Sequence, residues 1–481
     1  MKLKIKQSIL SVFAFALLAA SACTSDFEEI NTNPNGPLEV PSSLLISSVL
    51  TITGDQMYST FLGGDMGSCW AQHWGKVQYN DEARYQYRET VTNGMWVTFY
   101  ARSLADAKKM YELAQQEGNE NVQGVALTLS AYVYALLTDV YGPIPMSEAL
   151  AAPSGNNTPK YDSQPEVYDS LVNMLDLAVD KLGSGVGTIN ATSDLMYGGD
   201  ASKWQRFANS LLFRTIMRMS ATSEFSNYSS KLQEIYNSGT LFTSRDDEAK
   251  FAYLAAAPNN NPIYNTIVEG NRGEFKVNSK MIEVLEANGD PRLSVYAEVN
   301  EDGEYRGKPS GYTGLPTDEW NYTNVSSIGE FYLQATNPAL FLTYSEQEFF
   351  ISEAIARGFI TGGSALAQEH YNNAVTADLE SNGIGAADIA SYLEANGYAG
   401  VDKIAEEKWV SLYTQGLEAF TEWRRLQVPA LDLPVEAVED EIPSRYRYPR
   451  DEQSQNRESY DEAVEMLGGS DNLTTKLWWN K

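Results

Sequence analysis

Helical periodicity is the strongest constraint on what this chain can fold into. Between Trp204 and Met219 apolar residues recur at intervals of three and four positions, the pattern of a helix that buries one face. Asp200 precedes this stripe and is a suitable N-cap, because a carboxylate can accept hydrogen bonds from the first free backbone N–H groups. Ser163 and Glu166 have the spacing of a capping box before another stripe. Long amphipathic helices are therefore predicted.

The predicted helices come in pairs separated by glycine or proline. Trp96–Gln116 and Glu120–Val140 form one pair, and the second helix ends before Gly142 and Pro143. Thr343 and Glu346 form a second predicted capping box, and further helices are predicted around Tyr371 and over 401–415 and 417–426. Paired helices of this length are typical of tetratricopeptide-type repeats, whose period is about 34 residues. The predicted fold class is mainly all-α, with helix-pair repeats.

Two regions lack the helical pattern. Gly63–Gly94 is rich in Gly, Trp, Tyr and Gln, and Asp247–Leu342 contains several Asn-, Gly- and Pro-rich turns. Loop regions of this length in a compact protein are usually functional or disordered. Their aromatic residues argue against disorder. A ligand region at about 247–342 is therefore predicted.

The N-terminus has the composition of an export signal. Three lysines precede Ile9–Ala22, an apolar run that is too short to span a bilayer, which needs about 20 residues. Small residues then lead directly to Cys23, the arrangement of a lipoprotein signal. We predict a signal peptide over 1–22, acylation of Cys23, a flexible tether over 23–37 and a single helical domain over 38–481. The alternative is a secreted protein with an incidental cysteine.

Charge and cysteine content exclude several classes of protein. The formal net charge is −29, and it becomes about −32 without the three lysines of residues 1–22. Nucleic acids and anionic membrane surfaces are attracted by basic surfaces, so this charge argues against both as partners. If Cys23 is acylated, Cys69 is the one cysteine left, and no intrachain disulfide is predicted.

Motifs for catalysis and for metal or cofactor binding are absent from the sequence. His73 and His370 are far apart, and the chain has no zinc-protease, nucleophile-elbow, phosphate-loop or dinucleotide motif. No EF-hand spacing is present, and we predict neither a metal nor a cofactor. Two of the 64 acidic residues could lie at the separation that glycoside hydrolysis needs, so a glycosidase stays open as an alternative.

Several segments together resemble the SusD/RagB family of outer-membrane lipoproteins, in particular its SusD-like subgroup. "LTDVYGPIPMSEAL" (137–150) resembles the family signature TD-x-YG-x-x-P-x-x-EA, and "LTYSEQEFFISEAIARG" (342–358) resembles its Y-x-E-x-x-F-x-x-AEA helix, with Ser352 in place of the first alanine. Further similar segments are 159–171, 196–214, 290–297, 406–431, 442–456 and the tether "DFEEINTNPNGP" (26–37). The resemblance covers nearly the whole chain in order.

The resemblance implies a fold, a location, a partner and a function. The fold is a right-handed superhelical scaffold of four tetratricopeptide-like pairs, with loops and short strands on the opposite side. The location is the outer surface of a Gram-negative outer membrane, and the partner is a SusC-like TonB-dependent barrel. Members bind nutrients, usually oligosaccharides and sometimes peptides, and are not enzymes. A purely structural subunit of the transporter is a further alternative.

Ligand-binding residues are expected in the irregular segments. A sugar face stacks on an aromatic ring, and its hydroxyls bind amide, carboxylate or guanidinium groups beside that ring. The candidates are Trp70, Trp74, Tyr79, Asn259, Asn260, Tyr264, Arg272, Trp320, Asn321 and Tyr322. For Trp70 and Trp74, packing in the core is an equally good interpretation. For the Asn-rich turn, an ordinary turn is at least as good. His73 is interpreted as a satisfied polar group, not as a metal ligand.

Overall fold

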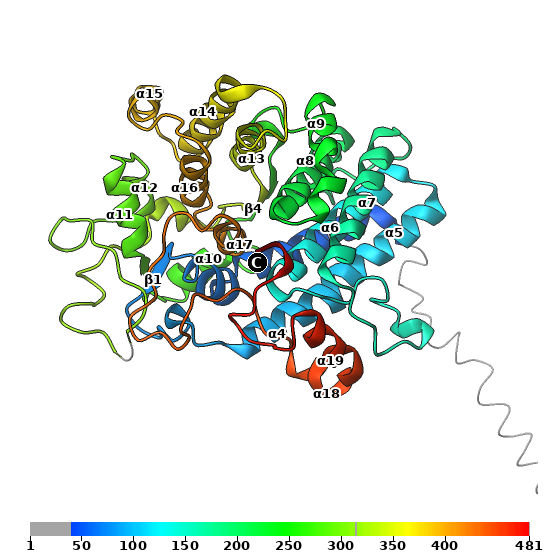
Figure 1. Cartoon of the computed structure of the whole chain (residues 1–481), viewed down its shortest axis with the longest axis horizontal. Coiled ribbons are helices and arrows are strands. Elements are labelled where there is room, and N and C mark those ends of the chain that lie inside the picture. The colour runs from blue at the N-terminus through cyan, green and yellow to red at the C-terminus, as the bar shows by residue number, and fades with distance from the viewer. Residues whose placement is uncertain (1–39, 313–314, 481) are drawn as a thin grey trace, which may run out of the picture. The chain divides into compact units, whose positions relative to one another are not determined.

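The amphipathic stripes of the sequence form the helices of the structure, a computed structural model that describes residues 40–312 and 315–480 (Figure 1). Among the described residues the α-helices of the first half are α3 (Leu45–Tyr58), α4 (Glu89–Thr98), α5 (Ala105–Glu117), α6 (Glu120–Tyr141), α7 (Gln164–Gly183), α8 (Ala201–Arg218), α9 (Ser229–Asn237) and α10 (Pro262–Tyr264). Those of the second half are α11 (Ser279–Ala287), α12 (Leu293–Tyr296), α13 (Tyr344–Ala356), α14 (Gly363–Ser381), α15 (Ala386–Ala395), α16 (Val401–Ser411), α17 (Gly416–Leu426), α18 (Arg450–Gln455) and α19 (Arg457–Met466).

Three π-helical segments and four short strands complete the elements used below. The π-helical segments are η2 (Thr60–Ser68), η4 (Phe99–Leu104) and η9 (Asn265–Glu269). The strands are β1 (Trp74–Lys76), β2 (Ala249–Phe251), β3 (Phe275–Val277) and β4 (Ala339–Leu342). They pair antiparallel, β1 with β3 and β2 with β4. The predicted ligand region at 247–342 therefore contains β2, β3 and β4, and β1 joins it from outside by pairing with β3.

Side chains cap the helices close to where the sequence predicts. The Asp200 carboxylate accepts from the backbone N–H groups of Ser202 and Lys203, at 2.9 and 3.2 Å. The capping box at Ser163 and Glu166 is present, with the Ser163 backbone N–H donating to the Glu166 carboxylate at 2.9 Å. Both N-caps fix the start of a helix whose apolar stripe is buried.

The second predicted capping box is only half formed. Thr343 Oγ1 accepts from the Glu346 backbone N–H at 3.0 Å, as expected of an N-cap. The Glu346 side chain does not return to Thr343 but pairs with Arg214 of α8 at 3.3 Å. The fully buried Glu346 carboxylate needs a charged partner, because leaving it unpaired would cost about 3–5 kcal/mol. The interpretation of Glu346 as a cap was therefore wrong.

Consecutive helices pack against each other as pairs. The most extensive contacts join α5 to α6, α6 to α7, α7 to α8 and α13 to α14. The predicted stripe on α8 lies in the core, where Trp204, Phe207 and Leu211 have no exposed surface. The mainly all-α class with tetratricopeptide-like helix pairs is confirmed.

A network of buried ion pairs joins the second half of the helices to α8. Glu353 of α13 pairs with Arg425 of α17 at 2.6 Å, and Glu422 pairs with Lys408 of α16 at 2.5 Å. Arg218 of α8 contacts Glu418 at 2.6 Å. Arg425 therefore has a structural role, because its planar guanidinium suits pairing with the buried carboxylates of Glu353 and Glu422.

Both regions expected to lack helix are partly helical, because α10, α11 and α12 lie within Asp247–Leu342. Gly63–Ser68 belongs to η2, and α4 begins at Glu89. Glycine permits η2 here because it packs backbone to backbone against α17: a Cβ on Gly416 would lie 1.9 Å from the Gly63 carbonyl oxygen. Sequence periodicity reveals a helix through its buried apolar stripe. The glycine-rich segment of η2 has no such stripe, so it was not predicted to be helical.

Three features bear on the membrane and on redox chemistry. Within the described residues, α6 alone has the length and apolar content of a bilayer-spanning segment, and 89% of its apolar window is buried in the protein, as in the core helix of a soluble fold. Cys69 is a buried free thiol. The predicted signal peptide, Cys23 and the tether lie outside the described residues.

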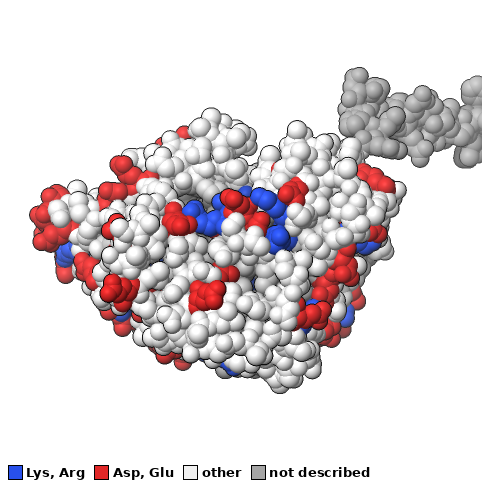
Figure 2. All heavy atoms as spheres, turned by 90° about the horizontal axis from the view of Figure 1, so that it is seen from above, with Lys and Arg blue, Asp and Glu red and all other residues white. Residues whose placement is uncertain are grey.

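Acidic and basic side chains are distributed differently over the surface. Figure 2 shows basic side chains gathered in a hollow in the upper middle of the face seen from above, with acidic side chains among them, and further acidic side chains towards both sides of the face.

Candidate functional site

Strand pairing brings two of the predicted ligand residues together. In the β1–β3 pair, Trp74 is opposite Val277 and Lys76 is opposite Phe275. The same register continues past the strands, where the Val77 N–H donates to the Glu274 carbonyl at 3.0 Å. It places Tyr79 opposite Arg272, although the two are far apart in sequence. The Arg272 guanidinium lies 5.4 Å from the centroid of the Tyr79 ring.

Two exposed rings contact this arginine, and a third lies beside them, bonded to the residue before Tyr79. Phe61 of η2, Tyr79 and Tyr322 are 39%, 56% and 40% exposed. Arg272 lies over Phe61 at 5.9 Å, and the Tyr322 hydroxyl donates to the Gln78 side chain at 2.6 Å. We call Phe61, Tyr79, Tyr322 and Arg272 the aromatic platform. Exposed rings grouped round one guanidinium offer both stacking and hydrogen bonding to a ligand.

A buried carboxylate fixes the arginine of the platform. Arg272 Nε donates to Glu274 Oε1 at 2.6 Å, and Glu274 is 2% exposed. This contact raises the pKa of the Arg272 side chain, because hydrogen bonding to Glu274 favours the charged form. The guanidinium is thereby oriented before any ligand arrives, which reduces the entropy lost on binding.

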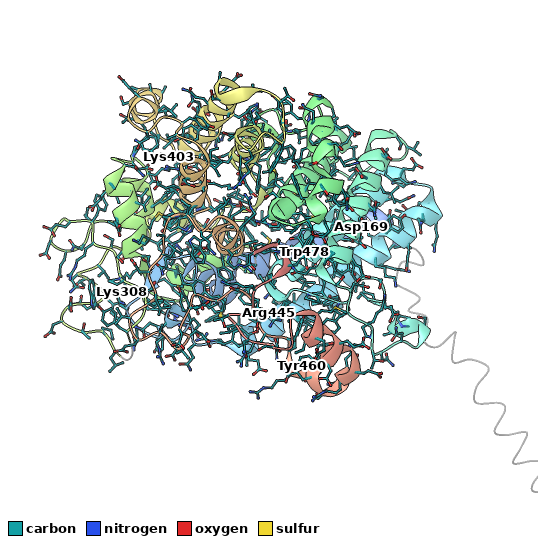
Figure 3. All side chains as sticks on the ribbon, viewed as in Figure 1. Asp169, Lys308, Lys403, Arg445, Tyr460 and Trp478 are labelled. Carbon is teal, nitrogen blue, oxygen red and sulfur yellow. The ribbon has the colours of Figure 1, made fainter. Side chains whose placement is uncertain are left out.

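One buried lysine, Lys276, fastens the loop that carries Tyr322, and a second, Lys308, bonds within its own segment. Lys276 Nζ donates to the Tyr322 carbonyl and to Ser327 Oγ, both at 2.8 Å. Lys308, labelled in Figure 3 on the same side of the molecule as β1, donates to the Pro309 carbonyl at 2.7 Å. Burial lowers the pKa of each lysine to about 8.

A buried charge cluster lies next to the platform and contacts Phe61. Lys76 Nζ lies 2.9 Å from Asp65 and 3.5 Å from Glu82. Arg88 contacts Glu82 as well and lies over the Phe61 ring at 5.7 Å. Burial raises the pKa of Asp65 well above its ordinary range. The cluster fixes Phe61 through Arg88 and couples η2 to β1.

A cavity of about 410 Å³ adjoins the platform at Phe61. We call it the platform cavity. It lies between α3, η2, η4 and the segment 258–266, and the Arg272 backbone N–H contacts Thr266 at the edge of that segment. Its volume is within the range of small-ligand sites, about 300–1,000 Å³. Hydroxyl, amide and charged groups line it, including Asp55, Thr98, Arg102, Asn260 and Asn265.

This arrangement suits binding better than catalysis. Asp55 is the one carboxylate among the described lining residues of the platform cavity, and burial raises its pKa. Glycoside hydrolysis requires two carboxylates about 5–9.5 Å apart across the bond. Within the parts of the chain that the structure describes, no cluster of three His, Cys, Asp or Glu residues is placed to hold a metal ion.

Trp70 and Trp74 are not in the candidate site. They are 0% and 1% exposed, and Trp70 packs edge-on against Tyr85, Phe420 and Tyr446. Trp70 Nε1 donates to the Glu82 carbonyl at 3.0 Å. Neither ring can stack on a sugar, because neither presents a face to solvent. Their prediction as ligand residues was wrong, and the core interpretation holds.

His73 is buried beside the same core. Its ring centroid lies 4.7 Å from that of Trp409, and burial lowers its pKa to about 3. It therefore stays neutral at physiological pH. Both of its ring nitrogens lack a protein hydrogen bond, so its interpretation as a satisfied polar group was wrong.

The remaining predicted residues divide between turns and the cavity. Asn321 Oδ1 accepts from the Thr323 and Asn324 backbone N–H groups and closes a turn. Trp320 is half-buried with Arg306 over its ring at 4.5 Å. Asn259 is exposed in the turn before α10, and Tyr264 is half-buried within α10. Asn260 is buried and lines the platform cavity.

Sequence reasoning missed Phe61. It lies four residues after Met57, which is on the buried stripe of α3, so an uninterrupted helix would bury both. The helix ends at Ser59, whose ψ is 127°, and the chain restarts as η2. This break takes Phe61 off the buried face. Amino-acid composition carries no signal of a helix break such as the one at Ser59, between Met57 and Phe61.

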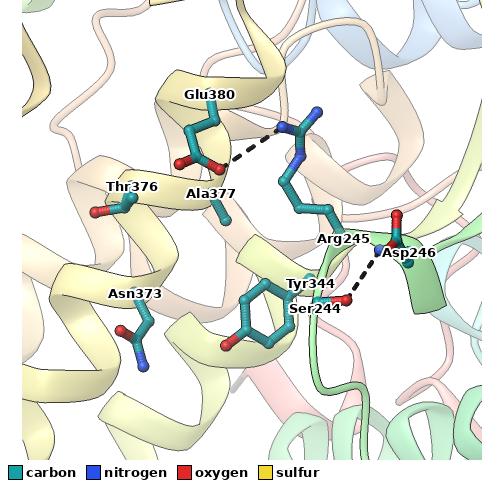
Figure 4. Close-up of a pocket in the computed structure, with 8 residues that line it drawn as sticks. All are labelled: Ser244, Arg245, Asp246, Tyr344, Asn373, Thr376, Ala377 and Glu380. Atoms are coloured by element: carbon teal, nitrogen blue, oxygen red, sulfur yellow. Dashed lines mark hydrogen bonds and ion pairs between the residues drawn. The ribbon is translucent and has the colours of Figure 1, made fainter. Parts of the chain in front are cut away.

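A second polar cavity, of about 330 Å³, lies between Arg245 and α14 (Figure 4). Arg245 Nη1 is 3.8 Å from the Glu380 carboxylate, and the half-buried Tyr344 ring forms one wall. None of the residues predicted from sequence lines it. The aromatic platform therefore remains the candidate ligand site.

The class of protein follows from the fold, and the comparisons agree. Residues 34–449 match the SusD-like family described as starch-binding and associating with the outer membrane. The chain belongs to this family. No protein of curated function matches it significantly.

Solved structures show the same fold. The chain is similar to a chitin-binding protein, with 27% identity, a TM-score of 0.79 and coverage of 92% of this chain and 100% of that one. It is similar in fold to a chitin-binding SusD homologue from Flavobacterium johnsoniae, with 21% identity, a TM-score of 0.78 and coverage of 91% and 98%. A SusD homologue from Bacteroides vulgatus has 23% identity, a TM-score of 0.78 and coverage of 92% and 97%.

Proposed function

We propose that this protein binds an oligosaccharide on the cell surface and delivers it to a SusC-like TonB-dependent barrel. The observation that carries the proposal is the aromatic platform with its adjoining cavity. Three exposed rings and a fixed arginine suit the apolar face and the hydroxyls of a pyranose. The family description, starch-binding and associating with the outer membrane, supports the same ligand class.

The sequence and the family description support the proposed location and partner. Acylation of Cys23 would anchor the chain in the outer membrane, with the acidic tether leading to the helical body. A binding protein that is not an enzyme requires a transporter to take up its ligand, which is the role of the barrel. Peptides remain the alternative ligand class, and a structural subunit of the transporter remains the alternative role.

Isothermal titration against chito-, cello- and malto-oligosaccharides and a peptide set tests the ligand class. Tyr79→Ala and Tyr322→Ala are each expected to weaken glycan binding about tenfold, because each removes a stacking ring worth about 1–1.5 kcal/mol. Phe331→Ala is the matched control, since Phe331 is 46% exposed but lies outside the platform.

Two outcomes would contradict the proposal. No glycan binding across the set, or equal loss in the Phe331→Ala control, would remove the platform from the function. Release of reducing ends during the titration would instead favour a glycosidase.

A further inference from the structure

Two buried lysines beside the aromatic platform have no carboxylate partner. The buried lysines of the described chain are Lys76, Lys276, Lys308 and Lys408. Lys76 lies 2.9 Å from Asp65, and Lys408 lies 2.5 Å from Glu422. To the residues that the structure describes, Lys276 and Lys308 donate only through carbonyl and hydroxyl oxygens. These oxygens satisfy hydrogen bonding but leave both charges unbalanced, although a buried charge is normally paired with an opposite one.

The two lysines project from one face of the β1–β3 pair. Lys276 is opposite Gly75, and a Cβ on Gly75 would lie 3.1 Å from the Lys308 Cβ. Because cross-strand partners point to the same face of a sheet, both lysines lie on that face. At neutral pH both remain mainly protonated, since burial lowers the pKa of each only to about 8. Two positive charges are therefore close together inside the protein.

An arginine adds a third positive charge at the same loop. Lys276 Nζ lies 5.9 Å from the centroid of the Tyr322 ring, and Lys308 Nζ lies 5.8 Å from that of Trp320. The guanidinium of the half-buried Arg306 lies over the Trp320 ring at 4.5 Å. No described residue forms an ion pair or a side-chain hydrogen bond with Arg306. We call Lys276, Lys308 and Arg306 the basic cluster.

The basic cluster is unusual in a chain that has 64 acidic and 35 basic residues. The acids nearest to it along the chain, Glu304 and Glu319, are exposed and pair with none of its members. A neutral hydroxyl can accept a hydrogen bond from Arg306 but does not balance the charge of the cluster. An oxyanion does both, and its hydrogen bonds with a guanidinium are about twice as strong as neutral ones.

We propose that the ligand is an acidic glycan, whose carboxylate or sulfate group binds beside Arg306 at the Tyr322 end of the aromatic platform. This inference rests on the proposed glycan-binding function and adds the ligand's chemical class. Arg306 contacts the oxyanion directly, because it is the half-buried member of the cluster. Lys276 and Lys308 attract it through their field, which salt screens little because both are buried.

Acidic tetrasaccharides and their neutralised forms provide matched probes. Oligomers of galacturonate and of mannuronate are compared with their methyl esters, which keep the backbone and remove the charge. A carrageenan tetrasaccharide and its desulfated form make the same comparison for sulfate. Isothermal titration of the whole protein is expected to show at least about tenfold tighter binding of the acidic form in one of these pairs, the effect of one charge-assisted hydrogen bond.

Variants locate the preference. Arg306→Gln should lower the affinity for the acidic form to that for its neutral form and leave binding of the neutral form unchanged. Arg447→Gln is the matched control, because it removes the same net charge from an exposed arginine that lies over the Tyr87 ring at 4.7 Å, outside the cluster. Since the Arg306 side chain makes no hydrogen bond, Arg306→Gln should melt close to the wild-type temperature, so lost affinity would not reflect unfolding.

The possible failures are distinguishable. Equal affinity for acidic and neutral forms in every pair, or a preference that survives in Arg306→Gln, would overturn the inference. Loss of the preference in Arg447→Gln as well would overturn the role of the basic cluster. Binding of neutral chito-, cello- or malto-oligosaccharides without any acidic glycan would overturn the inference too, but would leave the proposed function standing. Binding of no glycan, acidic or neutral, would count against both.

Discussion

At the scale of single residues, burial decides which aromatic side chains can bind a ligand. Trp70 and Tyr79 lie in the same irregular segment and have equally suitable chemistry. Trp70 has no exposed surface, whereas Tyr79 is 56% exposed and lies beside Arg272. The difference arises because Trp70 packs against rings from the C-terminal half of the chain, such as Phe420. Local sequence does not contain that contact.

Lys276 gives a prediction on pH. Burial lowers its pKa to about 8 in the folded protein, while the unfolded lysine keeps its proton up to about 10.5. Between these values the unfolded state binds more protons, so stability rises with pH. Relative to Lys276→Met, the wild type should gain up to about 3 kcal/mol in free energy of unfolding from pH 8 to pH 10.5.

Urea unfolding of both proteins at several pH values measures this difference. Lys308→Met repeats the test independently, since burial lowers the Lys308 pKa to the same value. A difference that stays constant with pH would mean that Lys276 is well solvated and does not fasten the Tyr322 loop from a buried position.

At the scale of elements, close backbone contact between η2 and α17 positions the platform. Gly63, Gly67 and Gly416 allow this contact, because a Cβ on Gly67 would lie 2.6 Å from the Gly416 carbonyl carbon. η2 carries Phe61 at its start and Asp65 of the buried charge cluster in its middle. The orientation of the ligand site thus depends on glycines that make no contact with a ligand.

Two glycine-to-alanine variants are expected to change stability in opposite directions. Gly416→Ala places a methyl group 1.9 Å from the Gly63 carbonyl oxygen, and backbone cannot yield easily, so a loss of about 2–3 kcal/mol is expected. Gly94→Ala, within α4 and with open space around its Cβ position, should stabilise by about 0.5–1 kcal/mol.

Thermal and urea unfolding of the two variants measure whether each substitution raises or lowers the free energy of unfolding. If Gly416→Ala were as stable as the wild type, η2 and α17 would have to be farther apart than the structure places them. Gly94→Ala shows in the same experiment that alanine is not harmful at helical glycines in general.

At the scale of the whole molecule, the net charge bears on how the protein could be held at a membrane. A net charge near −29 keeps the body soluble but does not attract it to an anionic membrane surface. A covalent lipid would supply membrane association, because each buried CH₂ contributes about 0.8 kcal/mol. Cys23, outside the described residues, is the predicted attachment point.

Cys23→Ala is expected to release the protein from the membrane. Fractionation of cells should move it from the membrane pellet to the soluble fraction, and mass spectrometry should find no acyl chains on it. Cys69→Ala is the control, because this buried thiol should leave membrane retention unchanged. Retention of the Cys23→Ala protein, or wild-type protein without acyl mass, would refute the anchor.

The sequence by itself determined the helical elements and the family. The stripe on α8 and the N-caps at Ser163 and Asp200 form as the sequence predicts, because both depend on neighbours within a few residues. The family signature could also be recognised from the sequence, because each of its segments is contiguous along the chain.

Only the tertiary structure decided which predicted ligand residues come together. Tyr79, Arg272 and Tyr322 meet because β1 and β3 pair in one register and Lys276 holds the loop beyond them. Phe61 joins them through a helix break, and Trp70 and Trp74 are withdrawn into the core. Exposure and proximity depend on contacts between distant segments, and periodicity along the chain carries no record of these contacts.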